Sequence, residues 1–182
     1  MGMSPKALAL LVLLVGSAGP CQAATPAKPA PKASARPAAA SGGFNARDPE
    51  GLISVLAGMG AKAEIAQTTD TEVFLKVATP AFAFNAQFVG CAKGRSCQGL
   101  AFSASSSQRK TTLVQLNAFN QTSISCRVFE DQGGRPHVMY STLVSAADTR
   151  EEMKAHIGVW QGCLSTFGLF LADPIGYLAD AP

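Results

Sequence analysis

The sequence predicts an α+β fold, in which an antiparallel sheet carries helices from the N- and C-terminal ends of the domain. Apolar residues alternate with polar ones in several short stretches, which is the period of a half-buried strand. A long stretch near the C-terminus repeats its apolar residues every three or four positions, which indicates a helix. In chain order the patterns predict a helix, four strands, a short helix, two strands and a long helix.

Residues 1–24 have the pattern of a secretory signal peptide. Lys6 supplies the positive charge, and the apolar run Ala7–Val15 is shorter than the ~20 residues of a membrane-spanning helix. Small residues favour cleavage near Ala23 or Ala24. We therefore predict a mature protein that is periplasmic or secreted and has no integral membrane span.

A lipoprotein is the competing interpretation of this segment, because Cys21 could carry a lipid. Pro20 directly precedes that cysteine and makes a poor processing site, which argues against the lipoprotein.

Residues 25–43 alternate alanine, proline and lysine and predict a disordered linker. Such a composition cannot bury enough apolar surface to order the chain, and repeated proline favours a semi-stiff, extended tether. An arm that binds a surface through Lys28, Lys32 and Arg36 is the alternative. The predicted domain covers residues 44–172, and residues 173–182 form a C-terminal tail.

The charge of the domain argues against nucleic acid as a partner. The chain has 15 basic and 12 acidic residues, but four of the basic ones precede residue 44. The remaining 11 nearly balance the 12 acidic residues, so the domain lacks the basic excess of a nucleic-acid-binding protein.

Four cysteines remain after signal cleavage, and an even count in an exported chain predicts two disulfides. Cys91 and Cys97 bracket a tight turn between two apolar stretches, so their pairing is the simplest of the three possible arrangements. Cys126 and Cys163 would then tie a strand to the last helix, unless they are two buried thiols. On the chain-entropy model the two bridges stabilise by about 2 and about 4 kcal/mol.

The residues predict neither a metal, a cofactor nor a catalytic site. The cysteines lack two close ligand pairs, and His137 and His156 have no companion at ligand spacing. A nucleophile needs a base and an orienting group, which the serine-rich run 103–107 does not have. Thiol–disulfide exchange by Cys91 and Cys97, beside Lys93 and Arg95, is the sharpest enzymatic alternative, and a structural bridge is favoured over it.

The first half of the domain begins with a helix and continues with strands. Asp48 can cap the helix and Pro49 fits its first position, while glycines at 58 and 60 end it. Strands are predicted over 62–67 and 72–77. Next come a strand with Phe82, Phe84 and Phe88 on one face, a strand over 98–105, and a short helix through Leu113, Leu116 and Phe119 capped by Thr111 or Thr112.

The second half predicts a hairpin and the long helix. The turn at 131–134 joins a strand through Ile124–Phe129 to a strand over 137–143. Asp148 or Thr149 can form a capping box at the start of the helix. Its apolar stripe comprises Met153, Ile157, Trp160, Leu164, Phe167 and Leu171. Gly158 and Gly162 lie on another side of this helix, where they would allow close approach to the sheet or, alternatively, to a partner helix.

These elements resemble the YbjN domain family, a group associated with bacterial sensory transduction. The likeness covers about residues 44–172. It is carried by Asp48-Pro49, Phe88-Val89-Gly90-Cys91, Cys97-Gln98-Gly99-Leu100-Ala101-Phe102, Leu116-Asn117-Ala118-Phe119-Asn120 and the helix from Trp160 to Phe167. The chain departs from the pattern at Phe119, where the resemblance leads us to expect tryptophan.

The resemblance implies a fold similar to that of type III secretion chaperones, which are dimers that bind extended segments of other proteins. It implies a binding or regulatory role and brings no catalytic residues. We therefore expect an exported, non-enzymatic protein with a protein partner in the cell envelope and, as an option, a homodimer. Asn117, Phe119, Asn120, Gly158 and Gly162 are the candidate binding residues. A sensory domain that binds a small ligand is the alternative.

Overall fold

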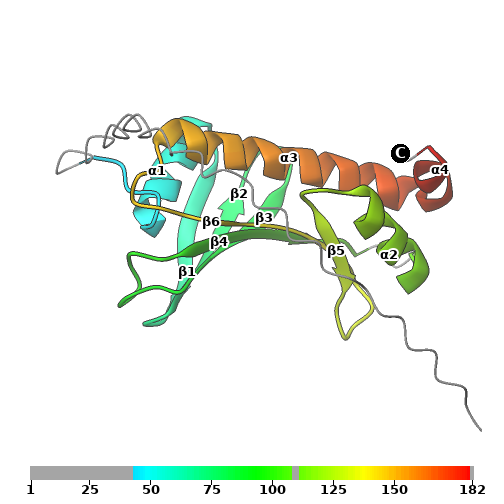
Figure 1. The fold of residues 1–182 in the computed structure, drawn as a ribbon, viewed down its shortest axis with the longest axis horizontal. Helices are drawn as coiled ribbons and strands as arrows, with labels where there is room; N and C mark the ends of the chain where they lie inside the picture. The colour runs from blue at the N-terminus through cyan, green and yellow to red at the C-terminus, as the bar shows by residue number, and fades with distance from the viewer. Residues whose placement is uncertain (1–42, 108–110, 181–182) are drawn as a thin grey trace, which may run out of the picture. The chain divides into compact units, whose positions relative to one another are not determined.

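The computed structural model describes residues 43–107 and 111–180, and it has the predicted α+β architecture. Its helices are α1 (Pro49–Gly58), α2 (Leu113–Thr122), α3 (Arg150–Ala172) and α4 (Pro174–Ala179). Its strands are β1 (Lys62–Thr68), β2 (Glu72–Ala78), β3 (Ala83–Val89), β4 (Gly99–Ser105), β5 (Arg127–Glu130) and β6 (Pro136–Leu143). The six strands form one antiparallel sheet in the order β1-β2-β3-β4-β6-β5 (Figure 1). The predicted signal peptide and linker lie outside the described residues.

The helices cover one face of the sheet, and the hydrophobic core lies between the two layers (Figure 1). Trp160 of α3 is fully buried at its centre, with ring centroids 5.6 Å from Phe84 and 5.9 Å from Phe102. Alternate residues of the central strands point toward this layer, as a period of two requires. Among the described residues, no helix covers the opposite face of the sheet (Figure 1).

Two of the predicted helix starts are confirmed, and one is wrong in its detail. Thr112 and Thr149 each form a capping box, with Gln115 and Glu152 respectively. Asp48 precedes α1 but makes no cap with its side chain. Its carboxylate instead accepts hydrogen bonds from the Ser96 backbone N–H and the Asn45 amide, both at 2.8 Å.

The segment predicted as a C-terminal tail contains a short helix, α4. Tyr177 of α4 lies 5.6 Å from the Phe119 ring and 5.7 Å from the Phe170 ring, measured between centroids. Burial of these rings orders a segment whose six-residue helix is too short to be stable alone.

The strand predicted to carry three aromatics begins one residue later than Phe82. Phe84 and Phe88 point into the core, whereas Phe82 lies in the β2–β3 turn and is half-buried beside Phe84. Thr79 holds that turn, because its hydroxyl donates to the Phe82 carbonyl and accepts from the Phe82 N–H.

Both predicted cysteine pairings are present, with S–S distances of 2.07 Å for Cys91–Cys97 and 2.06 Å for Cys126–Cys163. The first bridge closes the staple loop, residues 91–97. Lys93 and Gly94 both have positive φ, at 53° and 71°, which is the geometry of a type I′ turn.

The staple loop is docked on α1 and on the β1–β2 turn. Arg47 donates to the carbonyls of Ser96 and Cys97, and the Cys97 N–H donates back to the Arg47 carbonyl. The Gly94 N–H donates to the Asp70 carbonyl at 3.1 Å. The loop therefore joins the start of α1 to the sheet.

Candidate binding site

The helix-free face of the sheet carries a row of polar side chains. The strand register places Glu64 opposite Lys76, Lys76 opposite Asn85, and Asn85 opposite Ser103. Phe84 points to α3, so its neighbour Asn85 points to the other face of the sheet. Residues directly opposite each other on neighbouring strands share a face, so the whole row lies on that face. None of the four residues is buried.

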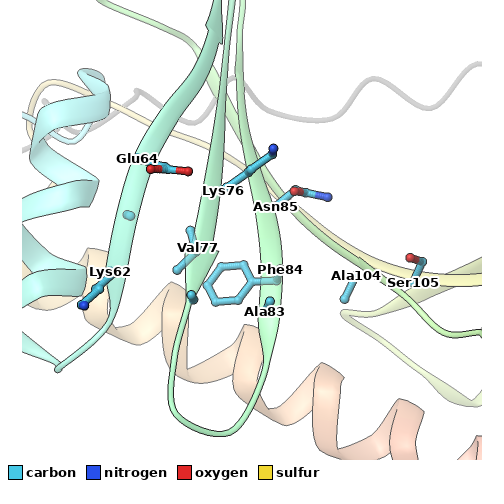
Figure 2. Close-up of a pocket in the computed structure, with 11 residues that line it drawn as sticks. Lys62, Glu64, Lys76, Val77, Ala83, Phe84, Asn85, Ala104 and Ser105 are labelled. Atoms are coloured by element: carbon cyan, nitrogen blue, oxygen red, sulfur yellow. The ribbon is translucent and has the colours of Figure 1, made fainter.

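A cavity of about 580 Å³ opens at the end of this row, where β3 and β4 separate (Figure 2). The two strands pair only from Asn85 and Ser103 onward, which leaves Ala83 and Phe84 unpaired with β4. We call the cavity the sheet groove. Its lining comprises Lys62, Ala63, Glu64, Lys76, Val77, Ala78, Ala83, Phe84, Asn85, Ala104 and Ser105.

The chemistry of the sheet groove suits binding better than catalysis. Its charges are two lysines and one glutamate, Lys62, Lys76 and Glu64, beside apolar residues of which most are alanine. Figure 2 shows Lys76 and Asn85 together on neighbouring strands, with the Phe84 ring between β2 and β3 in this view. Such a surface can pair with a charged group and bury an apolar one.

A second cavity of about 320 Å³ lies at the start of α1. Arg95 pairs with Glu50 there at 3.2 Å, and the Arg150 guanidinium lies 5.1 Å from the centre of the Phe44 ring. These contacts join the staple loop and α3 to the start of the domain, so we assign this cavity a structural role.

Asn120 has a structural position in the fold. Its Oδ1 accepts from the Val128 N–H at 2.8 Å, and its Nδ2 donates to the Val128 carbonyl at 2.9 Å. These bonds tie α2 to the outer edge of β5. Phe119 is fully buried against Phe170, whereas Asn117 is exposed on α2. A binding role for these asparagines stays a prediction.

Gly158 and Gly162 do not approach the sheet, so that expectation is wrong. Both are exposed on α3, and a Cβ built at either position has no described atom within 4 Å. The sheet packs against the opposite side of α3, through Trp160 and its neighbours. A role in contact with a partner helix stays a prediction.

The two histidines lie in different surroundings. The Tyr140 hydroxyl and His156 Nδ1 are 2.7 Å apart, and His156 is half-buried. His137 lies 3.1 Å from Asp131 and stacks on Phe129 with 5.0 Å between ring centroids.

Among the acidic residues that the structure describes, Asp131 is the one whose pKa is strongly shifted. The backbone N–H of Arg135, the His137 ring, the Arg135 guanidinium and the Gly133 N–H all donate to its carboxylate. These hydrogen bonds hold the pKa of Asp131 well below its ordinary value, and the bond from the Arg135 backbone has the largest effect. Burial of the carboxylate acts in the opposite direction. The cluster shapes the β5–β6 turn, as the sequence predicted for this segment.

One family model matches the chain, over residues 48–171, and its description is YbjN, "putative bacterial sensory transduction regulator". The chain belongs to the YbjN family. No curated protein and no solved structure matches it. The match covers every element from α1 to α3, so the sheet groove and both disulfides lie within the YbjN domain.

Two features of the YbjN domain bear on its location. Its two disulfides are typical of an oxidising compartment. Within residues 43–107 and 111–180, no helix is both long and apolar enough to cross a membrane. The same residues contain no group of three metal-ligating side chains.

The residues of the sheet groove were not among the predicted binding residues. The sequence predicts strands over 62–67 and 72–77, but only the register between them places Lys76 on the same face as Lys62 and Glu64. The separation of β3 from β4, which opens the groove, depends on the register and has no signal in the sequence.

Proposed function

We propose that this YbjN domain is an exported, non-enzymatic binding protein that acts as a chaperone-like adaptor on another protein of the cell envelope. The sheet groove carries the proposal. It lies on the helix-free face of the sheet, and it offers charges of both signs beside apolar residues. An extended protein segment could place a charged and an apolar side chain there at once.

The N-terminal segments support the envelope as the site of action. The signal peptide, residues 1–24, would direct export, and the proline-rich residues 25–43 would separate the domain from a neighbouring surface. The two disulfides fit the same compartment. The family's association with sensory transduction supports a regulatory rather than a metabolic role.

Site-specific photo-crosslinking in intact cells tests the proposal. A crosslinking amino acid at Asn85, in the groove, should capture one discrete envelope protein, and Lys76→Glu should reduce the yield. The matched control carries the same group at Lys154, which is exposed on α3. Equal capture at both positions, or no capture at Asn85, would contradict the adaptor function.

A sensory domain for a small ligand is the second candidate, because about 580 Å³ is within the range of small-molecule sites. Native mass spectrometry of the protein purified from its own cells separates the two functions. A bound small molecule that is lost in Asn85→Leu favours the sensor. A protein captured at Asn85 without such a molecule favours the adaptor.

A thiol-exchange function of Cys91 and Cys97 has weaker support. Cys97 is fully buried, and Arg95, which could stabilise a thiolate, is paired with Glu50. Reactive cysteines are partly exposed. A structural bridge accounts better for the docked staple loop.

A further inference from the structure

The two edges of the sheet differ in how their backbone groups are used. At the β5 edge, Asn120 bonds both the N–H and the carbonyl of Val128, and α2 covers the strand. At the β1 edge, no described residue outside β2 bonds the strand backbone between Lys62 and Gln67. We call this second edge the open edge. Unpaired edges readily accept another strand.

The open edge is regular over a short stretch only. The register with β2 shifts between Ile65 and Gln67, so the regular part spans Lys62 to Ile65. Met59, at the end of α1 that leads into β1, and Ile65 are 42% and 44% exposed. The edge therefore combines unpaired backbone with apolar surface, which native sheets usually cover.

We propose that a second copy of this chain pairs with the open edge, antiparallel, about a two-fold axis at Ala63. In this arrangement Lys62 lies opposite Glu64 of the second copy, and Glu64 lies opposite its Lys62. A two-fold interface always repeats each contact in this way. Ile65 then lies opposite Ala61 of the second copy, so the apolar residues meet on the helix side of the sheet.

Charge selects this register over its neighbours. If the helices of both copies lie on the same side of the joined sheet, residues directly opposite each other must point to the same face. The two-fold axis must then pass through a residue and not between two residues. An axis at Lys62 places lysine opposite lysine, and an axis at Glu64 places glutamate opposite glutamate. Like charges directly opposite each other destabilise an antiparallel pair. Only the axis at Ala63 gives both charges an opposite partner, so the sequence Lys62-Ala63-Glu64 is complementary to itself.

The pairing has a consequence for the sheet groove. Lys62 and Glu64 line the groove and also form the open edge. The dimer therefore brings the two grooves to either side of the axis, on the helix-free face of one continuous sheet. The dimer does not depend on what the grooves bind, so its test is independent of the proposed function.

Charge reversal at the open edge tests the dimer, with molar mass measured by sedimentation equilibrium over a range of concentrations. The wild-type mature protein should be a dimer. Lys62→Glu and Glu64→Lys should each raise the dissociation constant by about tenfold or more, because each creates two like-charge pairs. The double variant, Lys62→Glu with Glu64→Lys, restores both opposite pairs and should dimerise like the wild type.

Mixing the two single variants gives the sharpest readout. One variant then carries two glutamates and the other two lysines, so together they should form a heterodimer although each alone is largely monomeric. Asp180→Lys, directly after α4, which packs on α2 at the opposite edge of the sheet, is the control and should remain a dimer. Both edge residues are exposed, so circular dichroism should be unchanged in all variants.

Several results would overturn the proposal. A monomeric wild type at all concentrations would do so, and so would a double variant as weak as the single ones. A dimer that ignores every charge reversal but is lost on Gly162→Arg would place the interface on α3 instead.

Discussion

A single side-chain amide closes one edge of the sheet. Asn120 occupies the two backbone groups of Val128 that would otherwise face solvent or another strand. Asn117, three residues earlier on α2, is exposed and has no such contact. The two asparagines look alike in the sequence, but only one of them is required by the fold.

The first prediction compares these two residues. Asn120→Ala should lower the free energy of unfolding by about 1–3 kcal/mol, because it leaves the N–H and the carbonyl of Val128 without partners. Asn117→Ala should change it by less than about 0.5 kcal/mol. Urea denaturation followed by tryptophan fluorescence measures both. Equal effects would mean that the amide bonds of Asn120 are absent in solution.

The second prediction concerns acid stability and Asp131. The folded state lowers the pKa of this carboxyl. Its contribution to stability is therefore fully present above its unfolded pKa of about 3.9 and is lost as pH falls below that value. Asp131→Asn should reduce stability at pH 7 and flatten the loss of stability below pH ~4. Thermal melts from neutral to acidic pH measure this, with Asp180→Asn, directly after α4, as the control.

At the scale of elements, the two disulfides span very different distances in the sequence, 6 and 37 residues. The Cys91–Cys97 bridge closes a short loop that docks on α1, and the Cys126–Cys163 bridge joins the segment before β5 to α3. A bridge stabilises more when it closes a longer loop of the unfolded chain.

The third prediction orders the two bridges by this loop length. Replacing Cys91 and Cys97 by serine should cost about 2 kcal/mol, and replacing Cys126 and Cys163 about 4 kcal/mol. The first variant should remain folded, because Cys97 is one residue of a core that is centred on Trp160 and the aromatic residues around it. Denaturant unfolding measures both variants. Full retention of stability in either one would show that its bridge does not form.

The fourth prediction uses the glycines of α3. Gly158→Ala and Gly162→Ala should each raise the stability of the monomer by about 1 kcal/mol, because alanine favours the helix and the space is open. Gly94→Ala is the contrast. Its φ is +71°, and an added Cβ would lie 2.9 Å from Thr68 Cγ2, so this variant should be destabilised. Destabilisation at Gly162 as well would indicate that α3 packs against another surface.

At the scale of the whole domain, the helices and the sheet groove occupy opposite faces of one sheet. The helix layer buries Trp160 and the aromatic residues around it, which stabilises the sheet without using its other face. The helix-free face is left with the sheet groove, and β1 is left with the open edge. The proposed adaptor role and the proposed dimer both rest on this arrangement rather than on any one motif.

The sequence by itself determined the class of fold, the order of its main elements and the family. These follow from patterns within a few residues: alternation in strands, the apolar stripe of α3, turn glycines, and two threonines that cap helices. Both cysteine pairings could also be predicted, because four cysteines leave few arrangements and one pair brackets a turn.

Only the tertiary structure decided which polar residues do structural work and where a ligand could bind. Asp48 accepts a hydrogen bond from Ser96 of the staple loop instead of capping α1, and His156 lies at hydrogen-bond distance from Tyr140. In both cases the fold brings a partner that is distant in the sequence close to the side chain. α4 forms because Phe119 and Phe170 offer it a surface. The sheet groove arises from the register between β3 and β4. Register and docking depend on contacts between distant segments, which local sequence patterns do not encode.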